Sequence, residues 1–372
     1  MKLPEYASFE DKMQYYETNQ NLIGGSCFIN TEEEFDAMLN YIKSSQQEIE
    51  QQRQCVKEKF RNLELYKDDT EEAHQQRFIS MGLENDLFFR GVSEARYKMF
   101  ASAQRKWLEK DFETNGITYI NFVEGLLSQI RQNVLLNDYY SALRVPKNDL
   151  LYMSLLQHYG ECSPLVDISY DIKSALFFAL NYVDATDIEH KDEINKYCSL
   201  YVFNTFNNQY WADLSVILQA GQDSAAKLLD TSKHPIETID TSNVDSADKY
   251  TRWINNSNNG RGLHDWKLAL VKLPTAKGGI IPTTRIGEYI CWTNLNLLAQ
   301  KGAFLLYAND KTPLEEYIYH HKYLPNIICY NINKCLKDYI LGKIKLTEKN
   351  IYPKFKDIVE VEINTLLNSL KK

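Results

Sequence analysis

The segment that most constrains the fold lies near the middle of the chain, where a short apolar run is followed closely by a second, longer one. Leu165–Ser169 reads Leu-Val-Asp-Ile-Ser, which favours a strand. Ser174–Leu180 reads Ser-Ala-Leu-Phe-Phe-Ala-Leu, which indicates a buried helix. Directly before both stands Gln157-His158-Tyr159-Gly160, a block of residues able to bind a ligand. Because function gathers where rigid elements end and loops begin, this block predicts a functional site.

Strand and helix patterns alternate irregularly along the rest of the chain. Strands are expected at 86–92, 165–169, 198–203, 268–273, 279–282, 302–307 and 325–332, and helices at 99–111, 117–136, 149–158, 171–183, 333–342 and 355–371. A segment rich in Asn, Asp, Ser and Thr at about 204–262 is typical of an insertion. We therefore predict an α+β fold, with a mixed or antiparallel sheet flanked by helices over residues 84–372.

The first 83 residues predict a helical region that precedes this domain. Thr31 and Glu34 form a capping box at the start of a helix over 31–66, and a second helix is expected at 68–82. The region is either an accessory layer on the domain or an element that binds a protein partner. Its apolar stripe is too irregular for sustained heptads.

The charge balance bears on the class of ligand. The chain carries 42 basic and 50 acidic side chains and a formal net charge of -8, which argues against broad binding to nucleic acid or to membranes. No run approaches the roughly 18 apolar residues of a membrane span, and the N-terminus lacks the apolar core of a signal peptide. We expect a cytoplasmic protein.

The seven cysteines do not suggest a metal site. None forms a C-x-x-C pair, and Cys329 and Cys335 have no matching histidine pair nearby. They are expected to be reduced and mostly buried thiols, and Cys162 is expected not to act as a nucleophile. No bound metal is expected.

Four short motifs, taken in order, resemble the FRG domain, a mostly bacterial family named for Phe-Arg-Gly. They are Phe89-Arg90-Gly91, then Gln157–Gly160 with the strand and helix after it, then Arg285 followed by Gln300-Lys301-Gly302, and finally the segment from Leu341 to Pro353. The resemblance covers roughly residues 85–360. Pro164 and Ile168 stand where the family usually has Arg and Trp, so any anion contact of that Arg is either lost or supplied elsewhere, for which Arg261 and Arg285 are candidates.

The same order of segments is similar, more weakly, to ADP-ribosyltransferases. That similarity implies that Arg90 and His158 hold a phosphate or ribose of NAD, that Ser169 braces the nicotinamide pocket, and that Gln300 stands where transferases place a catalytic Glu. The residues taken as catalytic are His158, Asp167 and Gln300. The residues taken as ligand-binding are Arg90, Gly91, Gln157, Tyr159, Ser169 and Arg285.

Each of these residues also has a structural interpretation. Arg90 could form an ion pair with Asp86 or Asp167, and His158 could tie a helix end to a loop. Asp167 lies in an apolar strand, so its charge must be paired, bonded to backbone amides, or in contact with a pocket. Gln300 could bond neighbouring backbone. If it is instead the counterpart of the transferases' Glu, activity would be weak or would take its acid from Glu288 or Glu161.

Two classes of function remain open at this point. The first is an intracellular bacterial enzyme that acts on NAD or another nucleotide, as a toxin or an anti-phage effector. The second is a non-catalytic module that senses a nucleotide or binds a protein partner through its N-terminal helices. A metal-dependent nuclease is disfavoured, because no His or carboxylate cluster has suitable spacing.

Overall fold

A computed structural model describes most of the chain. The described residues are 3–16, 27–71, 73–74, 78, 86–143, 149–183, 193–206, 268–271, 294–321, 327–354, 356, 358–361 and 363. Most of the predicted polar insertion, the strand at 279–282, and most of the helices at 68–82 and 355–371 lie outside these residues.

The described core is one open sheet of seven strands in the order β1-β7-β4-β2-β3-β6-β5. Its strands are β1 (Phe28–Ile29), β2 (Leu87–Val92), β3 (Leu165–Ser169), β4 (Tyr197–Asn204), β5 (Leu268–Val271), β6 (Gly302–Tyr307) and β7 (Ile327–Asn333). β1 pairs with β7 in parallel, and the other five neighbouring pairs are antiparallel. The predicted α+β class with a mixed sheet is confirmed.

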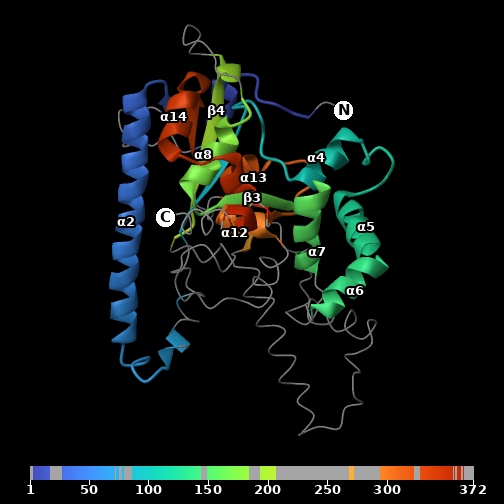
Figure 1. The fold of residues 1–372 in the computed structure, drawn as a ribbon, viewed down its shortest axis with the longest axis horizontal. Helices are drawn as coiled ribbons and strands as arrows, with labels where there is room; N and C mark the ends of the chain where they lie inside the picture. The colour runs from blue at the N-terminus through green and yellow to red at the C-terminus, as the bar shows by residue number, and fades with distance from the viewer. Residues whose placement is uncertain are drawn as a thin grey trace.

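Helices flank this sheet (Figure 1). They are α1 (Phe9–Met13), α2 (Glu32–Arg61), α4 (Ser102–Glu109), α5 (Tyr119–Arg131), α6 (Val134–Ala142), α7 (Asp149–Leu155), α8 (Ile172–Leu180), α12 (Leu295–Ala299), α13 (Leu314–His320), α14 (Lys337–Ile344) and α15 (Glu348–Ile351). One π-helical turn, Leu156–Gly160, follows α7, and two 3-10 turns lie at Ile194–Lys196 and Lys334–Leu336.

Two groups of helices cover different parts of one sheet face. α8, α2 and α14 pack on β2, β4 and β7, where their apolar side chains form one cluster. α4, α5 and α7 pack toward β3, β5 and β6 in a second cluster. In Figure 1, α2, α8 and α14 lie to the left and α4, α5 and α7 to the right, with β3 between the two groups. The boundary between the two groups is where a cavity opens.

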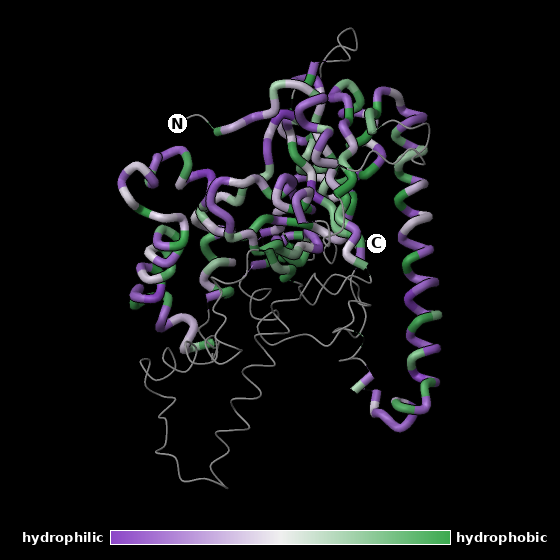
Figure 2. Tube along the Cα trace, turned by 180° about the vertical axis from the view of Figure 1, so that it is seen from behind, coloured by the Kyte–Doolittle hydropathy of each residue, from purple (hydrophilic) through white to green (hydrophobic). Residues whose placement is uncertain are grey.

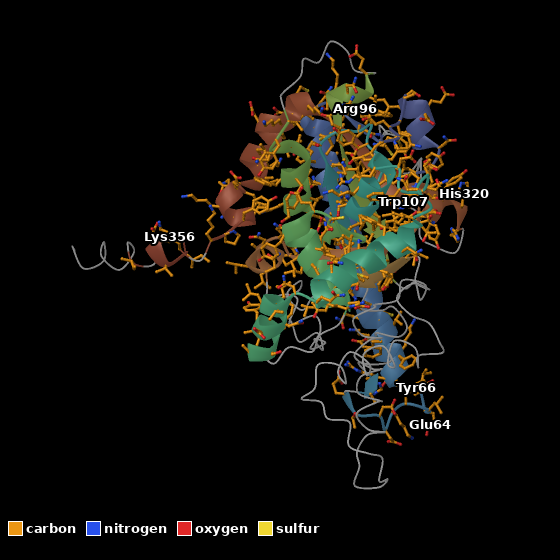
Figure 3. The ribbon with its side chains drawn as sticks, turned by 90° about the vertical axis from the view of Figure 1, so that its right-hand side faces the viewer. Glu64, Tyr66, Arg96, Trp107, His320 and Lys356 are labelled. Carbon is orange, nitrogen blue, oxygen red and sulfur yellow. The ribbon has the colours of Figure 1, made fainter. Side chains whose placement is uncertain are left out.

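The N-terminal region contributes to the same sheet and core. Thr31 caps α2, and the capping box with Glu34 is present as predicted. The buried side chains of α2 include Phe35, Met38 and Ile42, and they join the cluster of α8 and β2. Figure 2 shows that the rest of α2 is largely hydrophilic. Glu64 and Tyr66, just beyond the end of α2, lie far from Trp107 in the body of the fold (Figure 3).

Several helices differ from the sequence prediction in their boundaries; α2, expected to reach residue 66, ends at Arg61. The helix expected at 117–136 is two helices, because the Asn133 side chain accepts from the amide of Leu136 and starts α6. The helix expected at 149–158 is α-helical only to Leu155 and then widens into the π turn. The π turn places His158 beside the sheet. Such turns are frequent at functional sites.

Candidate functional site

A cavity of about 440 Å³ opens beside the point where β2 and β3 part. The two strands share the register pair Phe89 with Ser169 and no further pair among the described residues. β2 continues along β4, while β3 continues along β6. Because the strands diverge beyond that pair, the gap between them is occupied by side chains and is not bridged by strand-to-strand backbone hydrogen bonds.

Six predicted side chains line this cavity together with one predicted glycine. They are Arg90, Gln157, His158, Asp167, Ser169 and Gln300, with Gly91. They come from β2, the π turn, β3 and the end of α12, over a span of more than 200 residues. The sequence therefore identified residues that the fold brings together, although their roles in function stay predictions.

Arg90 bridges the gap between the diverging strands. Its Nη1 donates to the backbone carbonyl of Asp167 at 2.5 Å, and its Nε is buried without a hydrogen-bond partner among the described residues. Burial lowers the pKa of the guanidinium, an effect that the nearby Asp167 charge opposes. The alternative ion pair with Asp86 is absent from this part of the structure, since Asp86 lies 3.5 Å from Arg53 instead. One donor of Arg90 thus remains available to a ligand.

A short polar chain orients the Asp167 carboxylate. Gln157 Nε2 donates to Asp167 Oδ2 at 2.6 Å, and Gln157 Oε1 lies 3.2 Å from the hydroxyl of Ser102. Ser102 in turn accepts from the amide of Ser163 at 2.9 Å. A carboxylate held by a single amide donor keeps other lone pairs open, so it can contact a ligand as well.

His158 presents a buried nitrogen to the same cavity. Its Nε2 has no hydrogen-bond partner among the described residues, and its ring lies 5.6 Å from the ring of Phe304. Burial lowers the pKa of the imidazole, against an opposing contribution from Asp167. The ring is therefore neutral at pH 7 and can donate or accept through Nε2, according to its tautomer.

Gly91 has a packing role beside its place in the cavity wall. A Cβ built on this residue would lie 1.8 Å from the carbonyl oxygen of Ala175 in α8. The helix thus occupies the space beside Gly91 on this side. The glycine lets α8 lie directly against β2, and this contact fixes one wall of the cavity.

Ser169 and Gln300 are tied to the backbone. The hydroxyl of Ser169 donates to the carbonyl of Gln300 at 2.6 Å and accepts from the amide of Asp171 at 2.9 Å. Gln300 Nε2 donates to the carbonyl of Ile351 at 3.1 Å. These bonds join β3, α12 and α15 at the cavity, so both residues hold its shape.

Of the remaining candidates, the structure describes Tyr159 and Glu161. Tyr159 is 71% exposed and does not line the cavity. Arg285, Arg261 and Glu288 lie outside the described residues. Glu161, weighed in the sequence as a second carboxylate, does line the cavity and has a left-handed backbone with φ of 48°.

Sequence reasoning missed several wall residues, notably Ser102 and Arg105 of α4. No motif surrounds them, and an Arg on an exposed helix face carries no signal of its own. Only the packing of α4 against the π turn brings them to the cavity.

Two further features of the described residues concern metal ligands and membrane-spanning helices. Among the described residues, no group of three or more His, Cys, Asp or Glu side chains could hold a metal ion. In the same part of the chain, no helix combines the length and apolar character needed to cross a bilayer. Burial raises the pKa of the Cys162 thiol, which does not favour a nucleophilic thiolate.

Comparison with known families finds one match. Residues 85–188 match the model of the FRG domain. That segment contains β2, the π turn, β3 and α8, and thus most of the cavity's predicted residues; Gln300 lies outside it. No curated protein and no solved structure matches the chain.

Proposed function

We propose that this FRG-domain protein binds NAD or a closely related nucleotide in the cavity and cleaves the bond between nicotinamide and ribose, by a mechanism like that of ADP-ribosyltransferases. The observation that carries the proposal is the convergence of Arg90, His158 and Asp167 on one cavity, where two buried nitrogens have no hydrogen-bond partner among the described residues. The chemistry of these groups suits the parts of a nucleotide.

The two unpartnered nitrogens support ligand binding. A buried donor without a partner costs roughly 1–3 kcal/mol, and a bound ligand removes that cost when it supplies an acceptor. A phosphate oxygen suits the Nε of Arg90, because charge-assisted bonds to Arg are strong. A ribose hydroxyl suits the neutral Nε2 of His158, which needs a partner that can either donate or accept.

Asp167 supplies the charge that the reaction requires. The C1′–N bond breaks with its electron pair leaving on nicotinamide, so positive charge develops on the ribosyl carbon. A carboxylate in a partly buried cavity stabilises that charge more than it would in water. Water or another nucleophile attacks the carbon and loses its proton to a carboxylate of the cavity or to solvent. Glu161 is the other carboxylate in the cavity wall.

A cell-damaging role follows from this chemistry. Consumption of NAD deprives a cell of an essential dinucleotide, which fits an intracellular bacterial toxin or an anti-phage effector. Under this proposal, expression in a bacterial host lowers cellular NAD and slows growth, and a site variant relieves both effects.

Nicotinamide release from NAD by the purified full-length chain tests the reaction. Asp167→Asn keeps an acceptor for Gln157 but removes the charge, so we expect release to fall by about 100-fold or more while the folded state is retained. Asp138→Asn, an exposed change on α6 outside the cavity, should leave the rate unchanged. Absence of release by the unchanged protein would exclude the proposed activity.

The second candidate is a nucleotide sensor without catalysis. The bonds that commit Ser169 and Gln300 to the backbone favour it, since an amide stands where transferases place an acid. In that case NAD or ADP-ribose binds, Arg90→Gln weakens binding, and no nicotinamide appears. The N-terminal helices would then pass the signal to a protein partner.

A further inference from the structure

A second cavity, of about 790 Å³, adjoins the first. Both are lined by the same four residues, namely Arg90, Ser102, Arg105 and Glu161. The two cavities therefore form one cleft with two lobes that meet at these side chains. Each lobe lies within the range of about 300–1,000 Å³ usual for small-molecule sites.

Two guanidinium groups stand at this junction. The Arg105 side chain is exposed on α4 and makes no hydrogen bond or ion pair with the described residues. Its charge is close enough to contribute to lowering the pKa of Arg90, after the larger effect of burial. Like charges held together oppose each other, and an anion between them removes the repulsion. The unpartnered Nε of Arg90 gives such an anion a buried donor.

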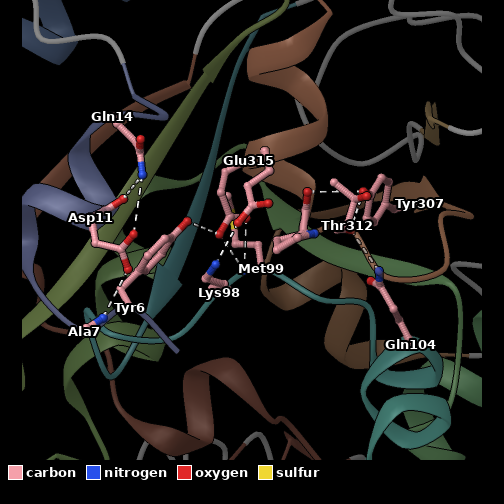
Figure 4. A network of polar contacts seen from close by, with 12 residues as sticks. Tyr6, Ala7, Asp11, Gln14, Lys98, Met99, Gln104, Tyr307, Thr312 and Glu315 are labelled. Carbon is pink, nitrogen blue, oxygen red and sulfur yellow. Dashed lines mark hydrogen bonds and ion pairs between the residues drawn. The ribbon is translucent and has the colours of Figure 1, made fainter. Parts of the chain in front are cut away.

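The second lobe is built largely by an N-terminal strap, which we define as residues 3–6, and by the segment Tyr97–Phe100. Tyr6 anchors the strap: its hydroxyl donates to Glu315 at 2.5 Å, and its amide donates to the carbonyl of Arg96 at 2.9 Å. Figure 4 shows Tyr6, Met99 and Glu315 in this network. The lobe thus has a fixed wall, with Lys98 and Lys106 also lining it.

We propose that the junction binds a diphosphate, and that the ligand is a dinucleotide with one nucleoside in each lobe. The inference rests on the proposed function, because it places the nicotinamide riboside in the first lobe beside Asp167. Two adjacent phosphates carry two charges, which match the two guanidinium groups. A mononucleotide would leave the second lobe and one arginine without a ligand group. Arg105 is thus assigned to the diphosphate, and the strap to the wall of the second nucleoside's site.

Equilibrium titration of the full-length chain with ADP-ribose and with AMP tests this assignment. We expect ADP-ribose to bind at least about tenfold more tightly than AMP, and Arg105→Gln to weaken ADP-ribose binding about tenfold. Arg105 is exposed, so its replacement should not affect folding. Lys110→Gln is the matched control, since it removes a positive charge from the end of the same helix but lines neither lobe.

The outcomes separate this inference from the reaction. If Arg105→Gln binds ADP-ribose as the unchanged protein does, or if AMP binds as tightly, the diphosphate assignment is wrong, even where nicotinamide is released. If ADP-ribose binding depends on Arg105 and no nicotinamide is released, the two-lobed site stands and the proposed reaction falls.

Discussion

Gly91 shows how closely one residue can couple packing to the candidate site. Its missing Cβ allows the Ala175 carbonyl of α8 to approach β2, and α8 forms part of the cavity wall through Phe178. The neighbouring Arg90 lines the junction of the two lobes. A change at Gly91 therefore acts on stability and on the site together.

Replacement of Gly91 by Ala should be strongly destabilising, by roughly 3 kcal/mol or more, because overpacking against backbone cannot be relieved by a rotamer change. Urea denaturation measures this loss. Gly125→Ala in α5 is the matched control: no atom lies within 4 Å of its added Cβ, so a gain of about 0.5–1 kcal/mol is expected. Equal effects of the two changes would contradict the packing at Gly91.

His158 should make stability depend on pH. Burial lowers its pKa in the folded protein, so the unfolded chain takes up a proton first as the pH falls through about 6.5. The contribution of the neutral, buried His158 to the unfolding free energy is fully present above that pH and is lost as the pH falls below it. We expect His158→Gln to flatten the decline in unfolding free energy between pH 8 and pH 5.5, with the exposed His320→Gln as the control. If the unfolding free energy of His158→Gln depends on pH as that of the unchanged protein does, the burial of the imidazole is contradicted.

For single residues, the sequence gives a signal only where strands and helices are strongly patterned around them. Arg90, His158 and Asp167 stood beside strong strand and helix signals, and the structure brings them to one cavity. Arg105 lies on an exposed helix face with no motif around it, so only tertiary packing identifies it. The packing of Gly91 against α8 joins segments that are distant in the sequence, so no local pattern indicates it.

Among the secondary-structure elements, the short α1 fixes the N-terminal strap to the sheet. Lys12 of α1 is fully buried, and its Nζ donates to Ser199 Oγ at 2.6 Å and to Asn331 Oδ1 at 2.8 Å. Burial lowers the pKa of the ammonium group. The lysine thereby links α1 to β4 and β7, near the strap that lines the second lobe.

Lys12→Ala should cost roughly 3 kcal/mol of unfolding free energy, because it leaves a cavity and removes the donor of two buried acceptors. The change should also weaken the binding of ADP-ribose more than the binding of AMP if the strap shapes the second lobe. Chemical denaturation and titration check the two effects. Lys349→Ala, in α15 and exposed, is the control. A loss below about 0.5 kcal/mol, the usual range of surface changes, would contradict the burial of Lys12.

Two element boundaries agree with the sequence prediction. The Thr31–Glu34 box starts α2, and the strand at Leu165–Ser169 has the predicted bounds. The break at Asn133 was missed because apolar spacing continues across it, although Asn is a good N-cap. The π turn at Leu156–Gly160 was missed because one wider turn hardly changes the apolar period.

For the whole molecule, the fold class followed from the alternation of elements, but the strand order did not. β1 pairs with β7 across about 300 residues, and no local pattern specifies such a partner. This pairing brings the N-terminal region into the sheet, while the division of the chain at residue 83 stays a prediction. The cleft likewise depends on global topology, since it forms where β2 and β3 turn to different neighbours.

We propose that one cleft holds a dinucleotide, with its glycosidic bond beside Asp167. A crystal structure of the full-length chain with a non-hydrolysable NAD analogue tests it most directly. We predict nicotinamide riboside in the lobe of His158 and Asp167, and the diphosphate between Arg90 and Arg105. An empty cleft at saturating analogue, or an analogue bound at a site that contacts neither arginine, would contradict the account.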